Sequence, residues 1–334
     1  MKRCAKLFSV LIIFFAVVSF ARAQTDSTPT GNLNDLSVTA SPEIPGADQQ
    51  VTLTLKTYLL NLASADIDWS IDGKSVQHGI GISTFTFTTK DVGQPTTIDV
   101  SVLPVGGYVI KKELIITPSS VDILWEATDS ATPPFYRGKA LPTTEATIKY
   151  VAIPNMKSQS GMLLDPKDMV YDWTNNYTPV QNASGYGKDS YTFKMPFTDQ
   201  GETVGVVAQL RDGGLSAQGQ VDTSIYDPLI VWYVSSPLYG PQFDQAINSG
   251  YTVSSNDVSI FAEPFFASPK DILSTNLSYT WTLNNETLDA QTTPNVLFLH
   301  RNDSNKGDAV VGLTIDNSEK YLQELTSSLT LHLQ

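Results

Sequence analysis

The chain has 334 residues, of which 21 are Lys or Arg and 34 are Asp or Glu; 41% of the residues are hydrophobic and 16% are charged. This length corresponds to two or three domains, and the apolar content excludes disorder for most of the chain. The formal net charge of −13 argues against nucleic acid as a partner, because phosphate binding needs clustered Lys and Arg side chains.

The N-terminus has the parts of an export signal. Three basic residues precede an apolar run at 7–21, and Ala21-Arg22-Ala23 fits the small-x-small cleavage pattern. We therefore predict a signal peptide over residues 1–23 and a disordered tether over residues 24–33. An uncleaved signal anchor is the alternative and the only membrane attachment that the sequence predicts, although its apolar run is shorter than the roughly 20 residues of a spanning helix.

The cysteine content indicates the type of exported protein. The only cysteine, Cys4, lies inside the predicted signal peptide. A mature chain without cysteine cannot be a disulfide scaffold, and vertebrate extracellular immunoglobulin domains normally contain a buried disulfide. We therefore predict a bacterial protein that is secreted or held at the cell envelope or surface.

A tryptophan recurs along the chain with a period of just over one hundred residues. Trp69, Trp173 and Trp281 lie 104 and 108 residues apart, each in a short alternating strand before a turn-forming pair of residues. A second landmark, Phe87, Phe193 and Phe298, has spacings of 106 and 105 residues. The two landmarks predict three repeats, and we expect these six aromatic residues to form the structural core.

A third landmark occurs only in the second and third repeats. Trp125 is followed by Pro133-Pro134-Phe135-Tyr136, and Trp232 is followed by Pro237-Leu238-Tyr239-Gly240-Pro241. The first repeat has no such segment. The second and third repeats are therefore closer to each other than to the first.

The hydrophobic residues alternate with period two in almost every segment, as in half-buried antiparallel strands. Short strands punctuated by Gly, Pro, Asn and Asp predict an all-β fold of three tandem immunoglobulin-like antiparallel β-sandwiches. We place the domains at 34–118, 119–226 and 227–334. Their junctions are short, which predicts an elongated rod. The only helix-like stretch is 318–325.

The order of motifs resembles the bacterial immunoglobulin-like and PKD-type repeat families of exported proteins. The resemblance rests on a Trp strand, an aromatic-Thr-Phe strand such as 191–193, a Gly turn and a Val-rich strand. The segment Trp69-Ser70-Ile71-Asp72-Gly73 is similar to the acidic Gly turn of PKD-type repeats. The resemblance implies a spacer, a stalk, or an adhesive or ligand-binding module, and it implies no catalytic residue.

Aromatic residues in loops are the candidate contacts for a ligand or partner. For Phe135 and Tyr136 the favoured alternative is packing between domains or over a sandwich edge. Tyr177 and Tyr186 flank an Asn-rich and Gly-rich loop that would present a sugar platform. Tyr239 completes the set of candidates.

The sequence shows no enzyme motif for a metalloprotease, a phosphate-binding loop or a nucleophile elbow. His78, His300 and His332 lie in ordinary surface contexts, and residues 303–308 fit an Asp-Gly type of turn better than a calcium loop. We predict no catalytic residue, cofactor site or metal site.

These observations predict a non-catalytic exported protein whose rod of repeats acts as a spacer or as a protein-binding module in adhesion or assembly. Its partner would be a protein or an envelope glycan. The alternative is a carbohydrate- or peptide-binding protein that uses the loop aromatic residues of the second domain. A hydrolase ranks third.

Overall fold

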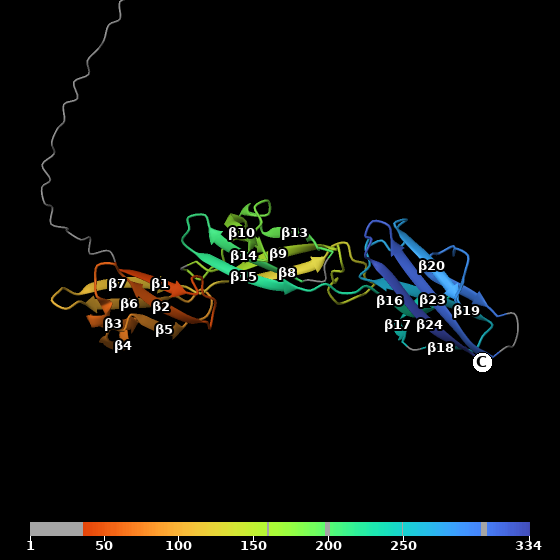
Figure 1. Ribbon diagram of the computed structural model, residues 1–334, viewed down its shortest axis with the longest axis horizontal. Coiled ribbons are helices and arrows are strands. Elements are labelled where there is room, and N and C mark those ends of the chain that lie inside the picture. Colours follow the sequence, from red (N-terminus) through yellow and green to blue (C-terminus); the bar gives the residue numbers. More distant parts are fainter. Residues whose placement is uncertain (1–35, 159, 198–200, 249, 302–305) are drawn as a thin grey trace, which may run out of the picture.

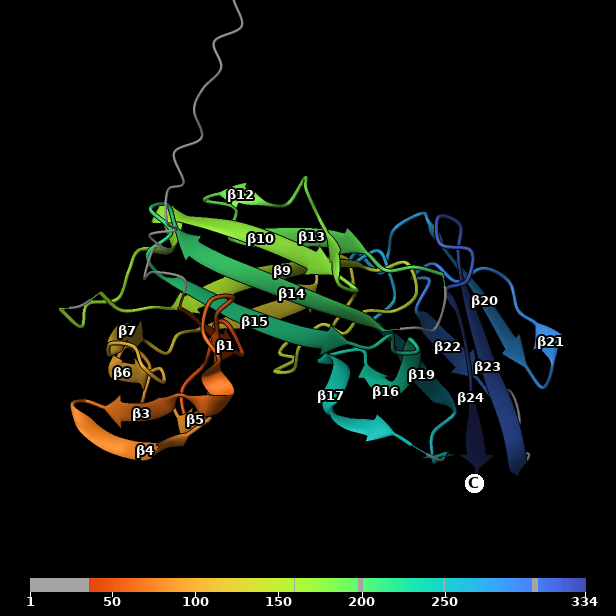
Figure 2. The same ribbon diagram turned by 60° about the vertical axis from the view of Figure 1, so that its left-hand side comes forward.

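The computed structural model describes residues 36–158, 160–197, 201–248, 250–301 and 306–334. The predicted all-β fold is confirmed: the described residues form 24 strands and only two short 3-10 turns. The strands build three sandwiches that follow one another along the long axis of the molecule (Figure 1). The array bends at its joints, with the second sandwich above the other two in Figure 2. The predicted signal peptide and tether lie outside the described residues.

The first sandwich packs a three-stranded sheet of order β1-β2-β5 on a four-stranded sheet of order β4-β3-β6-β7. Its strands are β1 (Ser37–Ser41), β2 (Gln50–Lys56), β3 (Asp66–Ile71), β4 (Lys74–Ile80), β5 (Thr84–Thr88), β6 (Thr96–Leu103) and β7 (Ile110–Ile116). A 3-10 turn, Leu62–Ser64, precedes β3 and is capped by the side chain of Asn61.

The second sandwich packs a sheet of order β13-β9-β8 on a sheet of order β11-β10-β14-β15, to which β12 adds through β10. Its strands are β8 (Ser120–Ala127), β9 (Thr147–Asn155), β10 (Met169–Asn175), β11 (Thr178–Pro179), β12 (Gly185–Tyr186), β13 (Ser190–Lys194), β14 (Glu202–Leu210) and β15 (Ser216–Thr223). A 3-10 turn, Pro166–Asp168, precedes β10.

The third sandwich packs a sheet of order β17-β16-β19-β22 on a sheet of order β18-β24-β23-β20-β21. Its strands are β16 (Leu229–Ser236), β17 (Gly240–Ile247), β18 (Tyr251–Val253), β19 (Asp257–Phe265), β20 (Leu277–Leu283), β21 (Glu286–Thr287), β22 (Val296–His300), β23 (Gly307–Asn317) and β24 (Glu324–Leu333). The short β18 pairs with β24 in parallel, whereas the other pairings are antiparallel.

One strand order is common to all three sandwiches. In one sheet of each sandwich, the opening strand pairs with a second strand, and the second strand pairs with a third. These trios are β1-β2-β5, β8-β9-β13 and β16-β19-β22. The facing sheet is built in the same way from β3-β6-β7, β10-β14-β15 and β20-β23-β24. This division of strands between two sheets is that of immunoglobulin-like sandwiches.

Each sandwich buries one of the repeated tryptophans at the centre of its core. Trp69, Trp173 and Trp281 are 0%, 0% and 2% exposed. They occupy equivalent strands, and each indole N–H donates a hydrogen bond to a backbone carbonyl near the start of the next strand of the facing sheet. The acceptors are Ile82, Lys188 and Pro294, at 3.0, 2.9 and 2.8 Å. The polar atom of a fully buried side chain is thereby satisfied.

The phenylalanine landmark needs a correction in the third repeat. Phe87 is buried and Phe193 packs at the margin of its core, but Phe298 is 58% exposed. The buried residue of β22 is its neighbour Leu297. Side chains alternate between the two faces of a strand, so matching the repeats one residue out of register selects the wrong face. The equivalent buried positions are Phe85, Tyr191 and Leu297, which are 106 residues apart in both intervals.

The helix-like interpretation of residues 318–325 is also wrong. Residues 318–323 form the turn between β23 and β24, and Glu324 and Leu325 already belong to β24. Of the two sandwiches that share the third landmark, the second has a long connection after its opening strand, at 128–146, whereas the third has the strands β17 and β18 between β16 and β19. The corresponding connection of the first sandwich is the much shorter 42–49.

Candidate functional site

The first joint connects the first and second sandwiches through backbone and side-chain hydrogen bonds. The amide of Ser119, in the junction itself, donates to the carbonyl of Pro45 at 3.2 Å, and its hydroxyl donates to the carbonyl of Ser216. The Gln218 side chain donates to the carbonyl of Ile44 at 3.0 Å. Two grooves of about 420 and 490 Å³ flank these contacts. Hydrogen bonds therefore connect the two sandwiches at the first joint, and open grooves remain beside these bonds.

The second joint is built by the connection 128–146 of the second sandwich. Its Ala131 exchanges two backbone hydrogen bonds with the third sandwich, as residues of paired strands do. The Phe266 amide donates to the Ala131 carbonyl, and the Ala131 amide donates to the Ala267 carbonyl, both at 2.7 Å. Ala131 and Ala267 are 1% and 0% exposed. The two sandwiches thus share a buried main-chain contact.

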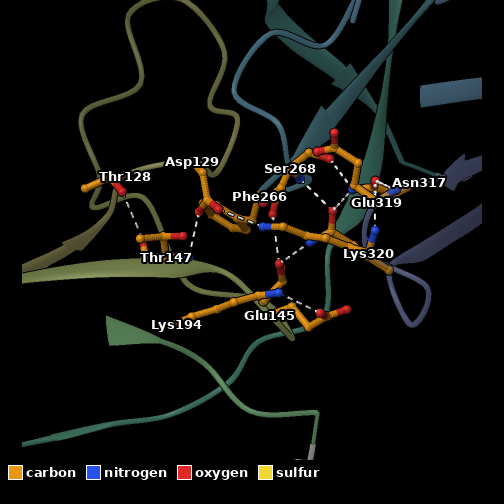
Figure 3. A network of polar contacts seen from close by, with 12 residues as sticks. Thr128, Asp129, Glu145, Thr147, Lys194, Phe266, Ser268, Asn317, Glu319 and Lys320 are labelled. Atoms are coloured by element: carbon orange, nitrogen blue, oxygen red, sulfur yellow. Dashed lines mark hydrogen bonds and ion pairs between the residues drawn. The ribbon is translucent and has the colours of Figure 1, made fainter. Parts of the chain in front are cut away.

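A network of buried polar side chains surrounds this contact (Figure 3). The Gln323 amide group donates to the Thr143 hydroxyl, and Thr143 donates to the Phe266 carbonyl at 3.3 Å. The Gln323 carbonyl oxygen accepts from the Ser268 amide at 2.7 Å and from the Asn317 side chain at 2.9 Å. Thr143, Gln323 and Ser268 are 0%, 2% and 1% exposed. Since buried polar groups are costly when unpaired, this network favours one relative orientation of the sandwiches.

An ion pair reinforces the same joint. Lys320 donates to one carboxylate oxygen of Asp129 at 2.7 Å, and the other oxygen of Asp129 accepts from the Thr147 amide at 2.8 Å. The side chains of Lys320 and Asp129 are only 12% and 27% exposed. Close by in Figure 3, Lys194 donates to Glu145, whose side chain is 5% exposed. Solvent and salt screen the sheltered Lys320–Asp129 pair less than they screen a surface pair.

Tyr136 lies at this joint. Its ring meets Phe265 and Phe266 edge to face, with centroid distances of 5.8 and 6.0 Å. The side chain remains 37% exposed, whereas the neighbouring Phe135, in the left-handed backbone region, is 95% exposed. The contacts of Tyr136 correspond to the interdomain packing that the sequence left open as an alternative to ligand binding.

The other predicted contact residues do not gather around Tyr136. Tyr177, 78% exposed, lies in the turn after β10, whereas Tyr186, 56% exposed, pairs with Val170 near the start of β10. The two tyrosines therefore lie toward opposite ends of one strand. Tyr186 also donates to Asp168 at 3.0 Å. Tyr239 is 81% exposed in the turn between β16 and β17 of the third sandwich.

The polar residues of the second joint were not among the predicted contacts. Thr143 and Gln323 are 180 residues apart in the chain. Thr143 follows the proline-rich segment, and Gln323 lies in the stretch whose sequence suggests a helix. A common polar residue in a polar turn carries no sign of burial, so sequence reasoning had no signal for them. The proline-rich and aromatic segment ending at Tyr136 was the available signal for the joint.

The three histidines each lie beside a carboxylate on the surface. His78 is within 3.7 Å of Asp66 and Asp68, and His300 and His332 contact Asp257 and Asp308 at 2.6 and 2.8 Å. The nearby hydroxyl of Ser75 donates to Asp68 and not to the histidine. A Ser-His-Asp arrangement needs the serine next to the imidazole. Within the described ranges, no three His, Cys, Asp or Glu side chains lie close enough to hold a metal ion. Most of the turn at 303–308 lies outside those ranges.

One carboxyl group of the third sandwich is titratable near neutral pH. Glu263 of β19 is 3% exposed, and burial raises the pKa of its carboxyl from an ordinary 4.5 to about 7. The folded state then binds more protons than the unfolded state between these two pKa values. The free energy of unfolding should therefore fall as the pH rises from about 4.5 to about 7 and stay low above it.

We expect Glu263→Gln to stabilise the protein at pH 8 by up to about 3 kcal/mol, since each pKa unit corresponds to about 1.4 kcal/mol. The variant should also lose the fall in stability between pH 5 and pH 7. Thermal unfolding of both proteins across this pH range measures the effect. Parallel pH profiles would show that Glu263 does not titrate differently in the folded state. The neighbouring Tyr233 and Tyr279, whose pKa values burial raises, stay neutral throughout this range.

Known proteins resemble the chain only weakly. No protein-family model and no curated protein sequence matches the chain. Among solved structures, the three N-terminal domains of the bacteriophage RB49 highly immunogenic outer capsid protein are similar at 13% identity, with 89% of this chain and 97% of that chain covered and a TM-score of 0.24. The central fibronectin-III array of RIM-binding protein is similar at 11% identity, with 88% and 95% covered and a TM-score of 0.30.

A third similar structure is SGBP-B of the Bacteroides ovatus mixed-linkage glucan utilization locus, solved with a mixed-linkage heptasaccharide. Its identity is 14%, the coverage is 86% of this chain and 64% of that chain, and the TM-score is 0.22. Because these identities and TM-scores are low, the assignment of immunoglobulin-like sandwiches rests on the strand order of the chain itself. Over the described residues, no helix has the length and apolarity that crossing a membrane requires.

Proposed function

We propose that the chain is a non-catalytic, exported bacterial envelope or surface protein whose three sandwiches form a stiff spacer for protein contacts. The observation that carries this proposal is the second joint. A spacer must keep its modules in a set order and orientation, and a buried network of hydrogen bonds with a sheltered ion pair does so better than a flexible linker.

The export part of the proposal is supported by the N-terminal sequence, which lies outside the described residues. The resemblance to bacterial immunoglobulin-like and PKD-type repeats points the same way. An absence of cysteine after residue 4 suits a sandwich that is stabilised by its core rather than by disulfides.

Fractionation of the native cells, followed by mass mapping of the N-terminus, tests the location. A mature chain that starts at Gln24 in the medium or at the surface supports an exported spacer. An intact Met1 in the membrane fraction would indicate a tethered stalk, which keeps the spacer role. An intact chain in the cytoplasm would contradict the proposal.

The non-catalytic part has a separate test. The purified protein should show no turnover in a screen of ester and glycoside substrates. Turnover that disappears on substitution of a single carboxylate or serine, with the fold intact, would make the protein a hydrolase.

A further inference from the structure

The three sandwiches differ in what lies beside their last strand. In the third sandwich, the short strand β18 pairs in parallel with the last strand, β24. In the second sandwich, the opening strand β8 lies beside the last strand, β15, and Gly219 comes so close to the Val121 carbonyl that no larger side chain would fit. A neighbouring strand therefore covers the last strand in both of these sandwiches.

In the first sandwich this place is open. Among the described residues, the last strand β7 pairs only with β6, and the opening strand β1 pairs only with β2. A groove of about 490 Å³ lies between these two edge strands. Val38 and Ala40 of β1, Leu114 and Ile116 of β7, and Leu215 of the second sandwich contribute its apolar lining. The core of the first sandwich is therefore partly open along this side.

The open part of β7 corresponds to the covered part of β24. Strand β18 pairs with Leu331 and the two residues that follow it. In the strand rows that contain the buried tryptophans, Lys112 of β7 is the counterpart of Ser327 of β24. Counting forward along both strands, Ile116 is the counterpart of Leu331. The groove that Ile116 lines thus lies where the third sandwich holds its additional strand.

The edge of β7 is also apolar at this place. Ile115 is 59% exposed and lines the same groove. Edge strands usually carry a charge or a proline, because their unpaired N–H and C=O groups otherwise pair readily with another strand. The Leu-Ile-Ile sequence of residues 114–116 contains neither. This part of β7 therefore offers backbone hydrogen-bonding groups next to an apolar groove, as strand-adding peptide sites do.

We propose that the first sandwich binds an extended segment of a partner protein, which adds to β7 as a parallel strand. Alternate apolar side chains of this segment fill the groove between β1 and β7, in the position that β18 has in the third sandwich. Because Leu215 lines the same groove, the added strand contacts both sandwiches at the first joint. The inference rests on the proposed role in protein contacts and names the kind of partner.

Charges near the two ends of the groove indicate the composition of the partner segment. Glu43 lines the groove close to the first joint, and Lys112 lies on the same face of β7 as Leu114, farther from the joint. Within the described ranges, neither charge forms an ion pair. A parallel strand begins near Lys112 and ends near Glu43. Its complementary charges are therefore acidic at the start and basic at the end.

A synthetic peptide with blocked ends, Asp-Val-Thr-Val-Thr-Val-Lys, is the probe. Fluorescence anisotropy of the labelled peptide, titrated with the natively processed protein up to about 1 mM, covers weak affinities. We expect saturable binding to wild type and at least about tenfold weaker binding to Ile115→Lys, because a charge on an edge strand opposes pairing. Ile80→Lys is the matched control and should bind like wild type, since Ile80 is 73% exposed on β4, at the opposite edge of the same sheet.

Two further peptides test the mode of binding. Asp-Val-Thr-Pro-Thr-Val-Lys should not bind, because proline interrupts the backbone ladder of a strand. Lys-Val-Thr-Val-Thr-Val-Asp should bind more weakly than the probe, and added salt should reduce the difference. Hydrogen exchange of the amides at 114–117 should become slower when the probe is bound.

Wild type that does not bind the probe, or equal binding by Ile115→Lys and Ile80→Lys, would overturn the proposal. Binding of the proline peptide as tight as that of the probe, or unchanged hydrogen exchange at 114–117, would also overturn it. A chain that dimerises through β7 without binding the probe would assign this edge to a second copy instead. None of these outcomes affects the spacer function, which the location and shape of the chain test.

Discussion

Replacement of Trp173 by alanine is expected to lower the free energy of unfolding of the second sandwich by about 3–5 kcal/mol. The indole is fully buried, its ring lies 5.9 Å from that of Tyr191, and its N–H donates to the Lys188 carbonyl. The substitution leaves a cavity between the two sheets and a carbonyl without its partner. Since whole domains are stable by only about 5–15 kcal/mol, the loss is a large fraction of the total.

Chemical denaturation of wild type and variant measures this loss, and the chain offers a matched control. Trp125, on the edge strand β8 of the same sandwich, is half-buried, and the Lys139 ammonium lies 3.7 Å above its ring. Trp125→Ala should cost about 1–2 kcal/mol, because it removes a partly exposed ring and an exposed cation–π contact. Equal costs for the two substitutions would contradict the central position of Trp173.

The second large effect concerns the joint rather than a core. Gln323→Ala removes the acceptor of the Ser268 amide and the donor to Thr143, both of which are buried. Only the bond to Thr143 crosses the joint, whereas Ser268 lies in the same sandwich as Gln323. A buried group left without a partner costs about 1–3 kcal/mol, so we expect the second and third sandwiches to lose about 1–3 kcal/mol of coupling and the third sandwich to lose a similar amount of its own stability. Each sandwich keeps its own core and should still fold.

Chemical unfolding curves measure the coupling between the second and third sandwiches. Wild type should unfold its second and third sandwiches together, and Gln323→Ala should separate them into two transitions. Hydrogen exchange at the Ser268 amide should also become faster. The neighbouring Leu322, which is 54% exposed, provides the control, and Leu322→Ala should change stability by no more than about 0.5 kcal/mol. If Gln323→Ala behaves like Leu322→Ala, the network does not couple the sandwiches.

The internal repeat made most of the fold predictable. Period-two alternation and the recurring tryptophans identify sheets and a core position, because both follow from local strand geometry. Phe298 was misplaced because a register error of one residue exchanges the two faces of a strand. The stretch at 318–325 was misread because the apolar Leu322 and Leu325 have the sequence spacing of one helix face. Leu322 lies in the turn between β23 and β24, and Leu325 lies in β24.

The joint was less predictable, and the reason is physical. Asp129 and Lys320 are 191 residues apart, and each is an ordinary charged residue in a polar segment. Their pairing depends on how two folded sandwiches contact each other. No periodic pattern in the sequence predicts that contact. By contrast, Tyr136 is recognisable in the sequence because proline and aromatic residues cluster in its segment.

We propose that the three sandwiches form one elongated rod with fixed joints. Small-angle X-ray scattering of the natively processed protein, at a concentration where only single chains are present, measures this shape. Three sandwiches end to end predict a maximum dimension near 100 Å and a radius of gyration of about 30 Å, with a profile that one rigid arrangement reproduces. A radius of gyration of about 20 Å, as expected for a compact chain of this length, or a profile that only a broad ensemble of orientations reproduces, would contradict the rod.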